Sequence, residues 1–178
     1  MTKLTDSPDR FGLVSRSLHW GMAALFALQF VSAAAHWALP RENTLRDTLW
    51  SYHVNLGVTL FLLVLLRGVW GLLNLSKRPT HVGLMGYAAK AGHAGLYVLM
   101  VIVPAIKIIG SAGGTRGFSY FGVQIFPARE TEILWTKTIS EWHGTMGWFL
   151  AALVLGHIGA AVIWHHLIKR DDVLKRMA

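Results

Sequence analysis

The sequence predicts an all-α integral membrane protein, a bundle of four helices that cross a bilayer. Its 178 residues are 53% hydrophobic with a mean hydropathy of +0.44, which is too apolar for an ordinary soluble domain of this length. The apolar residues form four runs, each near the roughly 20 residues that span about 30 Å of hydrocarbon. The predicted spans are residues 17–39, 51–74, 88–110 and 142–166. We therefore expect one domain, residues 1–178, without a separate soluble catalytic domain.

Helix-breaking residues separate the four runs. Pro40 ends the first run, and Pro79 follows two basic residues between the second and the third. Residues 110–117 are rich in glycine and precede Pro127, which predicts a long loop before the fourth span. Residues 1–10 are polar, so we expect no removable secretory signal and expect the first span to direct insertion.

The basic residues predict how the chain lies in the membrane. A formal net charge of +8 would favour nucleic-acid binding in a soluble chain, but here Lys and Arg lie in short clusters between apolar runs. These clusters are richer at the amino end, between the second and third spans and in the tail than on the other side. The positive-inside rule then places both chain ends in the cytoplasm. Membrane lipid is the predicted surrounding, and no nucleic-acid partner is expected.

Histidine is the main metal-binding side chain available to this chain. The sequence has no cysteine, which excludes disulfides, thiolate metal sites and iron–sulfur clusters, and it has nine histidines. A histidine inside lipid is costly unless it is paired, hydrogen-bonded or bound to metal. His81, in a connector, and His165 and His166, beside Lys169 at the inner interface, are expected to be solvated. The remaining six are His19, His36, His53, His93, His143 and His157.

The fourth predicted span carries two histidines in one stripe. His143 and His157 are 14 residues apart (143 to 157), which on a helix places them about 21 Å apart and only about 40° off the same face. A single metal cannot bridge that distance, whereas two haems at different depths could each take one ring as an axial ligand. The spacing therefore predicts two separate sites.

Alternating helix directions give each of these histidines a partner at its own depth. With both ends inside, His19 lies at inner depth on the first span and His53 at outer depth on the second. The predicted iron-ligand pairs are His19 with His157 and His53 with His143, each holding one haem between facing helices. Without a Cys-x-x-Cys-His motif, the two haems are expected to be non-covalent b haems. His36 lies about 100° around the helix from His19 and does not fit the same stripe.

Residues near these rings each have two interpretations. Gly57, one turn after His53, either gives a planar cofactor close access to the backbone or lets helices pack closely. His93 either hydrogen-bonds a haem propionate or a quinone oxygen, or bonds a neighbouring helix. Arg16 and Arg67, at inner depth, either pair with propionates or reach lipid phosphates.

A series of short motifs extends along nearly the whole chain. They are Arg16-Ser-Leu-His19-Trp20, His53-Val-Asn-Leu-Gly57 followed by Arg67, Gly92-His93 with Pro104, Glu141-Trp142-His143, Gly156-His157 and His165-His166. In these motifs, in their order and in their spacing, the chain resembles the bacterial cytochrome b561 family of the small four-helix type. The resemblance implies a multi-pass protein of the bacterial cytoplasmic (inner) membrane with two b haems, and the family's ligands match His19, His53, His143 and His157.

The resemblance also implies a reaction. Family members of this size resemble superoxide oxidases, which take an electron from superoxide on the periplasmic side and deliver electrons to ubiquinone. Lys107, Arg129 and Lys137 lie on the predicted outer side, where they either steer the superoxide anion or form a solvated loop.

Two other functions remain open at this point. One is a membrane anchor and electron-transfer cytochrome b subunit, which would need a dehydrogenase or hydrogenase-type partner. The other is a proton or metal transporter using histidines as relays. Transporters of that kind usually carry repeats and acidic residues near the midplane, whereas Asp and Glu are absent from the interior of all four predicted spans.

Overall fold

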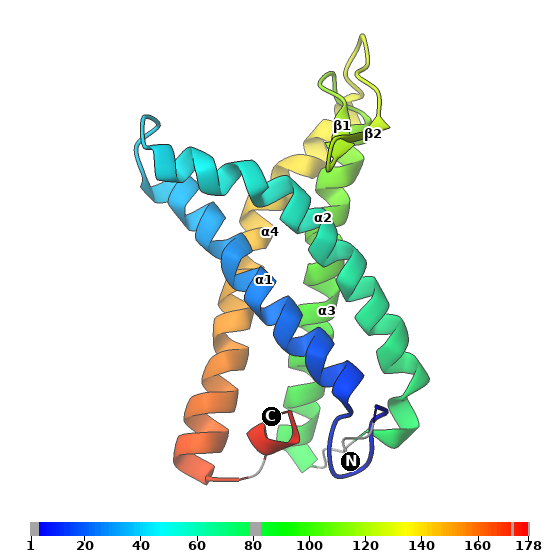
Figure 1. Ribbon diagram of the computed structural model, residues 1–178, viewed down its shortest axis with the longest axis vertical. Helices are drawn as coiled ribbons and strands as arrows, with labels where there is room; N and C mark the ends of the chain where they lie inside the picture. Colours follow the sequence, from blue (N-terminus) through cyan, green and yellow to red (C-terminus); the bar gives the residue numbers. More distant parts are fainter. Residues whose placement is uncertain (1–3, 79–82, 172, 178) are drawn as a thin grey trace.

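The computed structural model describes residues 4–78, 83–171 and 173–177, and it is dominated by four long helices. These are α1 (Leu13–Ala38), α2 (Thr44–Leu73), α3 (Gly83–Ala112) and α4 (Leu134–Gly159), and α4 continues as the π-helical segment η2 (Ala160–Lys169) (Figure 1). All four are long and apolar enough to cross a membrane. The predicted four-helix membrane fold is confirmed. His81, predicted to be solvated, lies outside the described residues.

The helices extend beyond the apolar runs from which they were predicted. Helix α2 begins at Thr44 instead of residue 51, because the Asn43 side chain accepts hydrogen bonds from the backbone N–H groups of Leu45 (2.9 Å) and Arg46 (3.3 Å). Helix α4 begins at Leu134 instead of residue 142. Hydropathy marks where lipid begins and not where the helix begins, so the first turns of both helices were missed; α2 has a side-chain cap, whereas α4 has none at Ile133.

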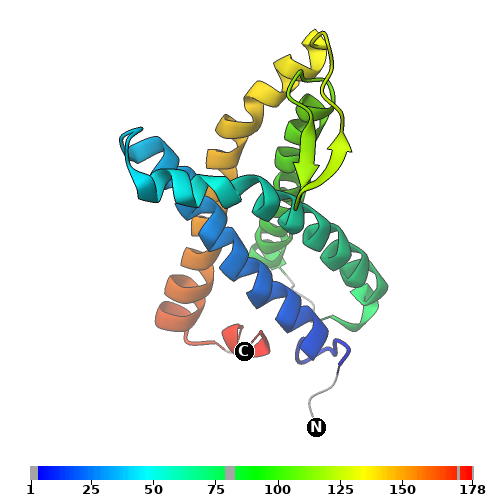
Figure 2. The ribbon, with the colours of Figure 1, turned by 45° about the horizontal axis from the view of Figure 1, so that its top comes forward.

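The four helices form two antiparallel hairpins. Helix α1 packs mainly on α2, and α3 packs mainly on α4, while contacts of α2 with α3 join the two hairpins. The α1–α2 connector lies at one end of the molecule, and the described ends of the chain lie at the other (Figures 1 and 2). This arrangement is the one that the alternating spans predicted.

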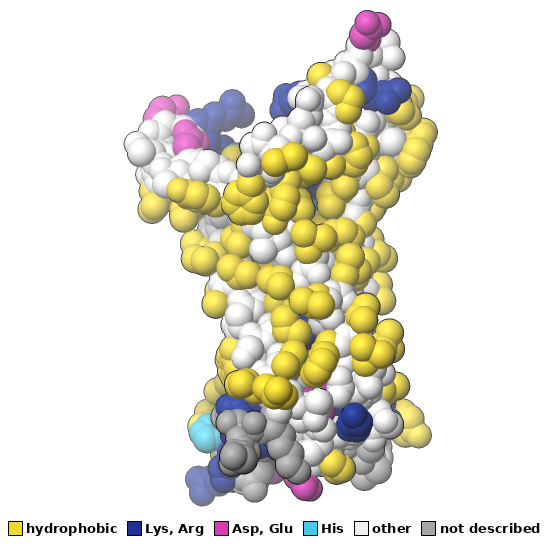
Figure 3. All heavy atoms as spheres, turned by 45° about the vertical axis from the view of Figure 1, so that its right-hand side comes forward, with side chains coloured by type: hydrophobic (Ala, Val, Ile, Leu, Met, Phe, Trp, Pro, Cys, Tyr) yellow, Lys and Arg dark blue, Asp and Glu magenta, His cyan; other side chains and the backbone are white. Residues whose placement is uncertain are grey.

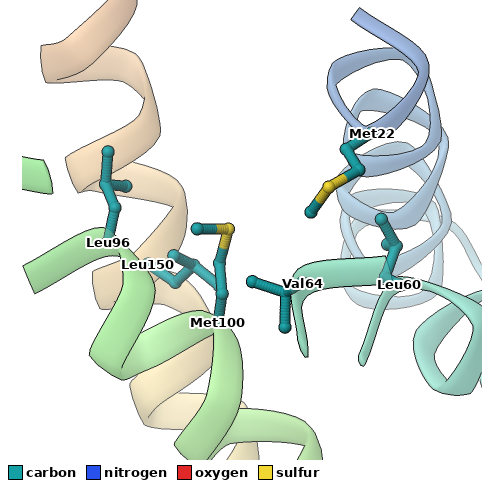
Figure 4. Packing of buried hydrophobic residues seen from close by; sticks show 6 residues of the cluster. All are labelled: Met22, Leu60, Val64, Leu96, Met100 and Leu150. Carbon is teal, nitrogen blue, oxygen red and sulfur yellow. The ribbon is translucent and has the colours of Figure 1, made fainter. Parts of the chain in front are cut away.

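The buried core is small and draws on all four helices. Figure 4 shows its side chains converging between the hairpins. The cluster consists of Met22, Leu60, Val64, Leu96, Met100 and Leu150. Large hydrophobic side chains also cover the outside, with most of the visible Lys and Arg toward the two ends (Figure 3). An apolar outer belt with charged ends is the surface that a bilayer requires.

A β-hairpin occupies part of the segment predicted to be a long loop. Strands β1 (Phe118–Tyr120) and β2 (Val123–Phe126) pair antiparallel, with a bulge between Phe118 and Ser119. Phe121 (φ 45°) and Gly122 (φ 82°) make the two-residue turn. The hairpin docks on α2 through the Tyr120 and Thr59 hydroxyls (2.9 Å) and through the Phe121 N–H, which donates to Asn55 Oδ1 (3.1 Å).

Short segments complete the end that holds the chain termini. A 3-10 turn, η1 (Leu75–Lys77), follows α2, and another, η3 (Leu174–Arg176), lies in the tail. The tail returns to α1, where the Trp20 indole donates to the carbonyl of Met177 (2.8 Å) and Phe11 N–H donates to the carbonyl of Arg176 (3.1 Å).

Candidate functional site

Two pairs of histidine rings face one another across the hairpins. The ring centres of His53 on α2 and His143 on α4 are 6.2 Å apart, and those of His19 on α1 and His157 on α4 are also 6.2 Å apart. Imidazole nitrogen binds a first-row metal such as zinc at about 2.0–2.1 Å, with the ring centre about 1.1 Å behind it, so a metal shared by two rings separates their centres by about 6.2 Å. The spacing of both pairs therefore fits one iron each.

Hydrogen bonds hold His53 in the form that can bind a metal. The Ser32 hydroxyl donates to the Gln29 carbonyl (2.7 Å), so its oxygen accepts from His53 Nδ1–H (2.9 Å). The lone pair then lies on Nε2, where it accepts from the Gln29 side-chain amide (3.1 Å). Iron binding at Nε2 requires the Gln29 amide to turn away, and Gln29 Oε1 is buried without a hydrogen-bond partner among the described residues.

A hydrogen bond to α3 gives His143 the same protonation as His53. Its Nδ1 lies 2.8 Å from the carbonyl oxygen of Val103, the residue before Pro104 in α3. A carbonyl can only accept, so Nδ1 carries the proton and Nε2 keeps the lone pair. A carbonyl that accepts from Nδ1–H fixes the ring and raises the basicity of Nε2 toward a metal.

A cavity of about 610 Å³ lies around this outer pair, within the size range of sites that hold cofactors. His53 and His143 line it together with Gly57, Gly144 and Gly147. A Cβ added at Gly144 or Gly147 would meet nothing within 4 Å, so these positions open into the cavity. At Gly57 it would approach the Gln29 amide at 3.1 Å. The outer site thus combines two rings in the protonation state that metal binding requires with room for a planar group.

The inner pair fits in spacing but not yet in protonation. Arg67 Nη2 lies 2.9 Å from His19 Nδ1, and because a guanidinium only donates, His19 accepts there and carries its proton on Nε2. Binding iron through Nε2 requires that proton to move to Nδ1 and Arg67 to leave. Nearby, Arg16 Nε is buried without a hydrogen-bond partner among the described residues.

His93 lies beside the inner pair. Its ring centre is 5.3 Å from that of His157, which is shorter than the spacing of two rings that share a metal. Its Nδ1–H donates to the carbonyl of Ala89 in its own helix (2.7 Å). The partner of Nδ1 therefore lies in the same helix and not in a neighbouring one, and the predicted contact with a propionate or a quinone stays a prediction. Since Nδ1 carries the proton, Nε2 keeps the lone pair and accepts hydrogen bonds in the neutral ring.

An aromatic stack beside the outer pair was missed by the sequence analysis. The Trp50 ring stacks on His53 (centres 4.4 Å apart, planes 24° apart) and on His36 (3.8 Å, 17°). Ser32 and Gln29 were missed as well. The only sequence signal is weak, because Gln29, Ser32 and His36 are polar positions inside an apolar run.

The basic residues predicted to steer a substrate do not line the cavity. Lys107, Arg129 and Lys137 are all exposed, and none is among the residues that form its wall in the described part of the chain. Lys137 is paired with Glu132 (3.0 Å). Lys107 lies on α3, one turn beyond Val103, whose carbonyl accepts from His143. The arginines that line the cavity are Arg41 and Arg46.

Of the two interfacial histidines, His165 has a clear partner. Its Nδ1–H donates to the carboxylate of Asp171 (2.8 Å), beyond the end of the helix. This hydrogen bond lowers the pKa of Asp171.

Sequence comparisons show the family of the chain. Residues 10–178 match the profile of the family described as prokaryotic cytochrome b561. The chain belongs to this cytochrome b561 family. It is 25% identical to cytochrome b561 homolog 2 of Escherichia coli K12 over 97% of this chain and 93% of that protein. It is 26% identical to cytochrome b561 homolog 1 of the same organism over 95% and 97%.

Membership in the cytochrome b561 family confirms the resemblance seen in the motifs. The chain is a multi-pass bacterial membrane protein and an electron-transfer cytochrome of this family, which implies haem b as its cofactor. The outer histidine pair meets the requirements of that cofactor on the structural observations above. When bound, haem would supply one-electron chemistry at iron, and this chain would supply the His53 and His143 rings, their orientation and a mostly apolar wall.

Proposed function

We propose that this cytochrome b561 binds two b haems and passes electrons across the cytoplasmic membrane from superoxide on the periplasmic side to ubiquinone. The observation that supports it is the repetition of the same ring spacing, 6.2 Å, at two levels of α4. The pairs would be His53 with His143 at the outer level and His19 with His157 at the inner one. Their ligands on α4 lie about 21 Å apart along the helix.

The proposed reaction balances by electrons. Each superoxide gives up one electron and leaves as O₂, and two such electrons together with two protons convert ubiquinone to ubiquinol. The ligand pairs hold the two electron carriers at different depths, so no side chain needs to carry charge between the aqueous phases. Gly57 would admit the outer macrocycle.

At the inner level, Arg16 and Arg67 would pair with haem propionates. Arg67 has a donor already directed at His19, and Arg16 has a buried donor without a partner, so both can supply hydrogen bonds to a carboxylate. His93 would contact a propionate or the quinone there, with its proton moved from Nδ1 to Nε2 so that it can donate to either oxygen.

The haem count tests the first part. Pyridine haemochrome assay per polypeptide on the purified protein should give two b haems, and a ratio of one or none contradicts the proposal. A stopped-flow pulse of superoxide should then reduce the haems, and a ubiquinone analogue should reoxidise them. If protein with two haems is not reduced by superoxide, the remaining function is a cytochrome b subunit that exchanges electrons with a dehydrogenase or hydrogenase-type partner.

Charge steering tests the place of superoxide entry. In the proposed steering, the anion is attracted by three basic residues, Lys107, Arg129 and Lys137. In that case haem reduction should slow as added salt shortens the Debye length below about 10 Å. Replacing all three by Gln should slow reduction at low salt and flatten the salt dependence, with both haems retained. A rate that ignores both salt and the triple replacement rules out steering by these residues.

A further inference from the structure

The outer cavity is polar at one end. Most of its wall is apolar, from Phe26, Phe30 and Leu60 to Trp148. Its positively charged lining residues, Arg41 and Arg46, both come from the α1–α2 connector and the first turn of α2, where His36 at the end of α1 also joins the wall. A ligand with an acidic edge would therefore find cations at this end of the cavity.

Arg46 is held rigidly at this end. Its Nε donates to the carbonyl of His36 (3.2 Å) and its Nη2 approaches His36 Nε2 (3.4 Å). Its Nη1 bonds Asp47 (2.8 Å), but the Asp47 side chain is 62% exposed, against 15% for Arg46, so water screens the carboxylate more than the guanidinium. Arg46 thus keeps unused donors and much of its charge for a ligand.

His36 contributes a second donor that needs an acceptor. Because the Arg46 guanidinium only donates, His36 Nε2 accepts and the proton lies on Nδ1. This Nδ1 is buried and has no hydrogen-bond partner among the described residues. A buried donor left unpaired costs free energy, so an arrangement that supplies an oxyanion at this position is favoured.

A b haem carries two propionate carboxylates on one edge of an otherwise apolar macrocycle. When His53 and His143 hold its iron in this cavity, the carboxylate edge is stable only beside cations or in water. The apolar wall offers neither. We propose that His36, Arg41 and Arg46 bind the propionates of the outer haem and so fix the orientation of the macrocycle; this inference rests on the proposed two-haem function.

The same cationic end would also suit a small free anion such as superoxide, so the experiment separates the two sources. Arg41→Gln, Arg46→Gln and the double variant are made in the full-length protein and purified with haem. Arg116→Gln, which replaces an exposed arginine of the same side that does not line the cavity, is the matched control. The outer haem is identified as the one lost in His143→Ala.

Two measurements on each variant report on the propionates directly. The double variant should release the outer haem to an excess of apomyoglobin on the order of tenfold faster, as loss of a charge-assisted hydrogen bond implies. Its outer midpoint potential should shift to more negative values, because removing positive charge beside the carboxylates favours ferric iron. The inner haem should keep its release rate and potential, which excludes a general folding defect. Arg46→Lys, which restores charge without the planar fork, should recover the potential and only part of the retention.

These measurements distinguish propionate binding from binding of a free anion and from an effect on folding. Unchanged haem release and potential in the double variant, with slower reduction by superoxide, would mean that the site binds the free anion and would overturn the inference. Equal release of both haems would overturn it too, because the arginines would then act on folding. A wild-type ratio other than two haems would refute the proposed function itself.

Discussion

At the scale of single residues, the position of one proton decides whether a histidine can bind iron. His53 and His143 both carry it on Nδ1, because Ser32 and the Val103 carbonyl accept there. His19 carries it on Nε2, because Arg67 donates to its other nitrogen. At the outer site both Nε2 atoms therefore keep a lone pair, and only the Gln29 amide has to turn away from His53; at the inner site Arg67 has to leave and the His19 proton has to move as well.

Removing the Ser32 hydroxyl tests this organisation. Ser32→Ala leaves His53 Nδ1–H without its acceptor, which weakens the ring as a donor to iron. We expect roughly 10–100-fold weaker retention of the outer haem, the usual cost of losing such a partner. Its midpoint potential should rise. Ser111→Ala is the control, since the Ser111 hydroxyl bonds the Lys107 carbonyl. Equal haem retention in the two variants would contradict the role of Ser32.

Replacing the two proposed ligands on α4 tests the pairing. His143→Ala should lose mainly the outer haem and His157→Ala mainly the inner one, because each removes one ring of a separate pair. Haem content and reduced-minus-oxidised spectra of the purified variants measure this. If either variant keeps both haems with unchanged spectra, the assignment of ligands is wrong.

At the scale of elements, the glycines of α4 and of the outer end of α3, including Gly113 directly after it, divide into two kinds. A Cβ at Gly113 would collide with Thr136, and one at Gly110 with Ser140, so these glycines allow the outer ends of α3 and α4 to touch. Gly144 and Gly147 have open space instead and face the cavity. The sequence left both interpretations open for glycines near the histidines, and geometry assigns each to particular residues.

Two alanine substitutions should separate these kinds. Gly113→Ala must push α3 away from α4 and should cost about 1–3 kcal/mol of stability through overpacking. Gly147→Ala should leave the stability of the polypeptide nearly unchanged but weaken binding of the outer haem, because its methyl group enters the cavity. Thermal unfolding and haem release distinguish the two. The reverse pattern, a stable Gly113→Ala and an unfolded Gly147→Ala, would refute this division.

The periodicity of the sequence predicted the features that are set within single helices and by their order along the chain. The stripe from His143 to His157 and the alternating directions of the helices were enough to pair the four histidines as the structure places them. The contacts of Trp50 and Ser32 with His53 depend on how α1 and α2 are rotated against each other, which no local pattern encodes. The β-hairpin was read as a loop, because its two short strands are set by the turn at Phe121 and Gly122 and by docking on α2.

At the scale of the whole molecule, the end that holds the chain termini is closed by a buried polar network. The Asp6 side chain is fully buried, and its carboxylate accepts from Arg78 Nε (2.9 Å) and from the N–H of Gly12 (2.9 Å). Arg78 follows α2 and Gly12 precedes α1, so the network joins the two helices of the first hairpin. The opposite end is joined by the α1–α2 connector.

This network predicts a pH dependence of stability. Burial raises the pKa of Asp6, but hydrogen bonds from Ser15, Gly12 and Arg78 and the charge of Arg78 together lower it below its ordinary value of 3.8. A lowered folded-state pKa adds stability above the unfolded-state value, which is lost as pH falls through the folded-state value. Asp6→Asn should therefore cost about 1.5–3 kcal/mol at neutral pH, as hydrogen bonds to a charged group do.

The gap in melting temperature between the wild type and Asp6→Asn should be constant from neutral pH to about pH 5 and should shrink below 3.8, where wild-type Asp6 takes up a proton. Asp9→Asn, at an exposed position a few residues away, should track the wild type throughout. Thermal unfolding in detergent, followed by helical circular dichroism across this pH range, measures the gap. A gap that persists unchanged below pH 3 would mean that the Asp6 charge contributes nothing and that only the shape of the side chain matters.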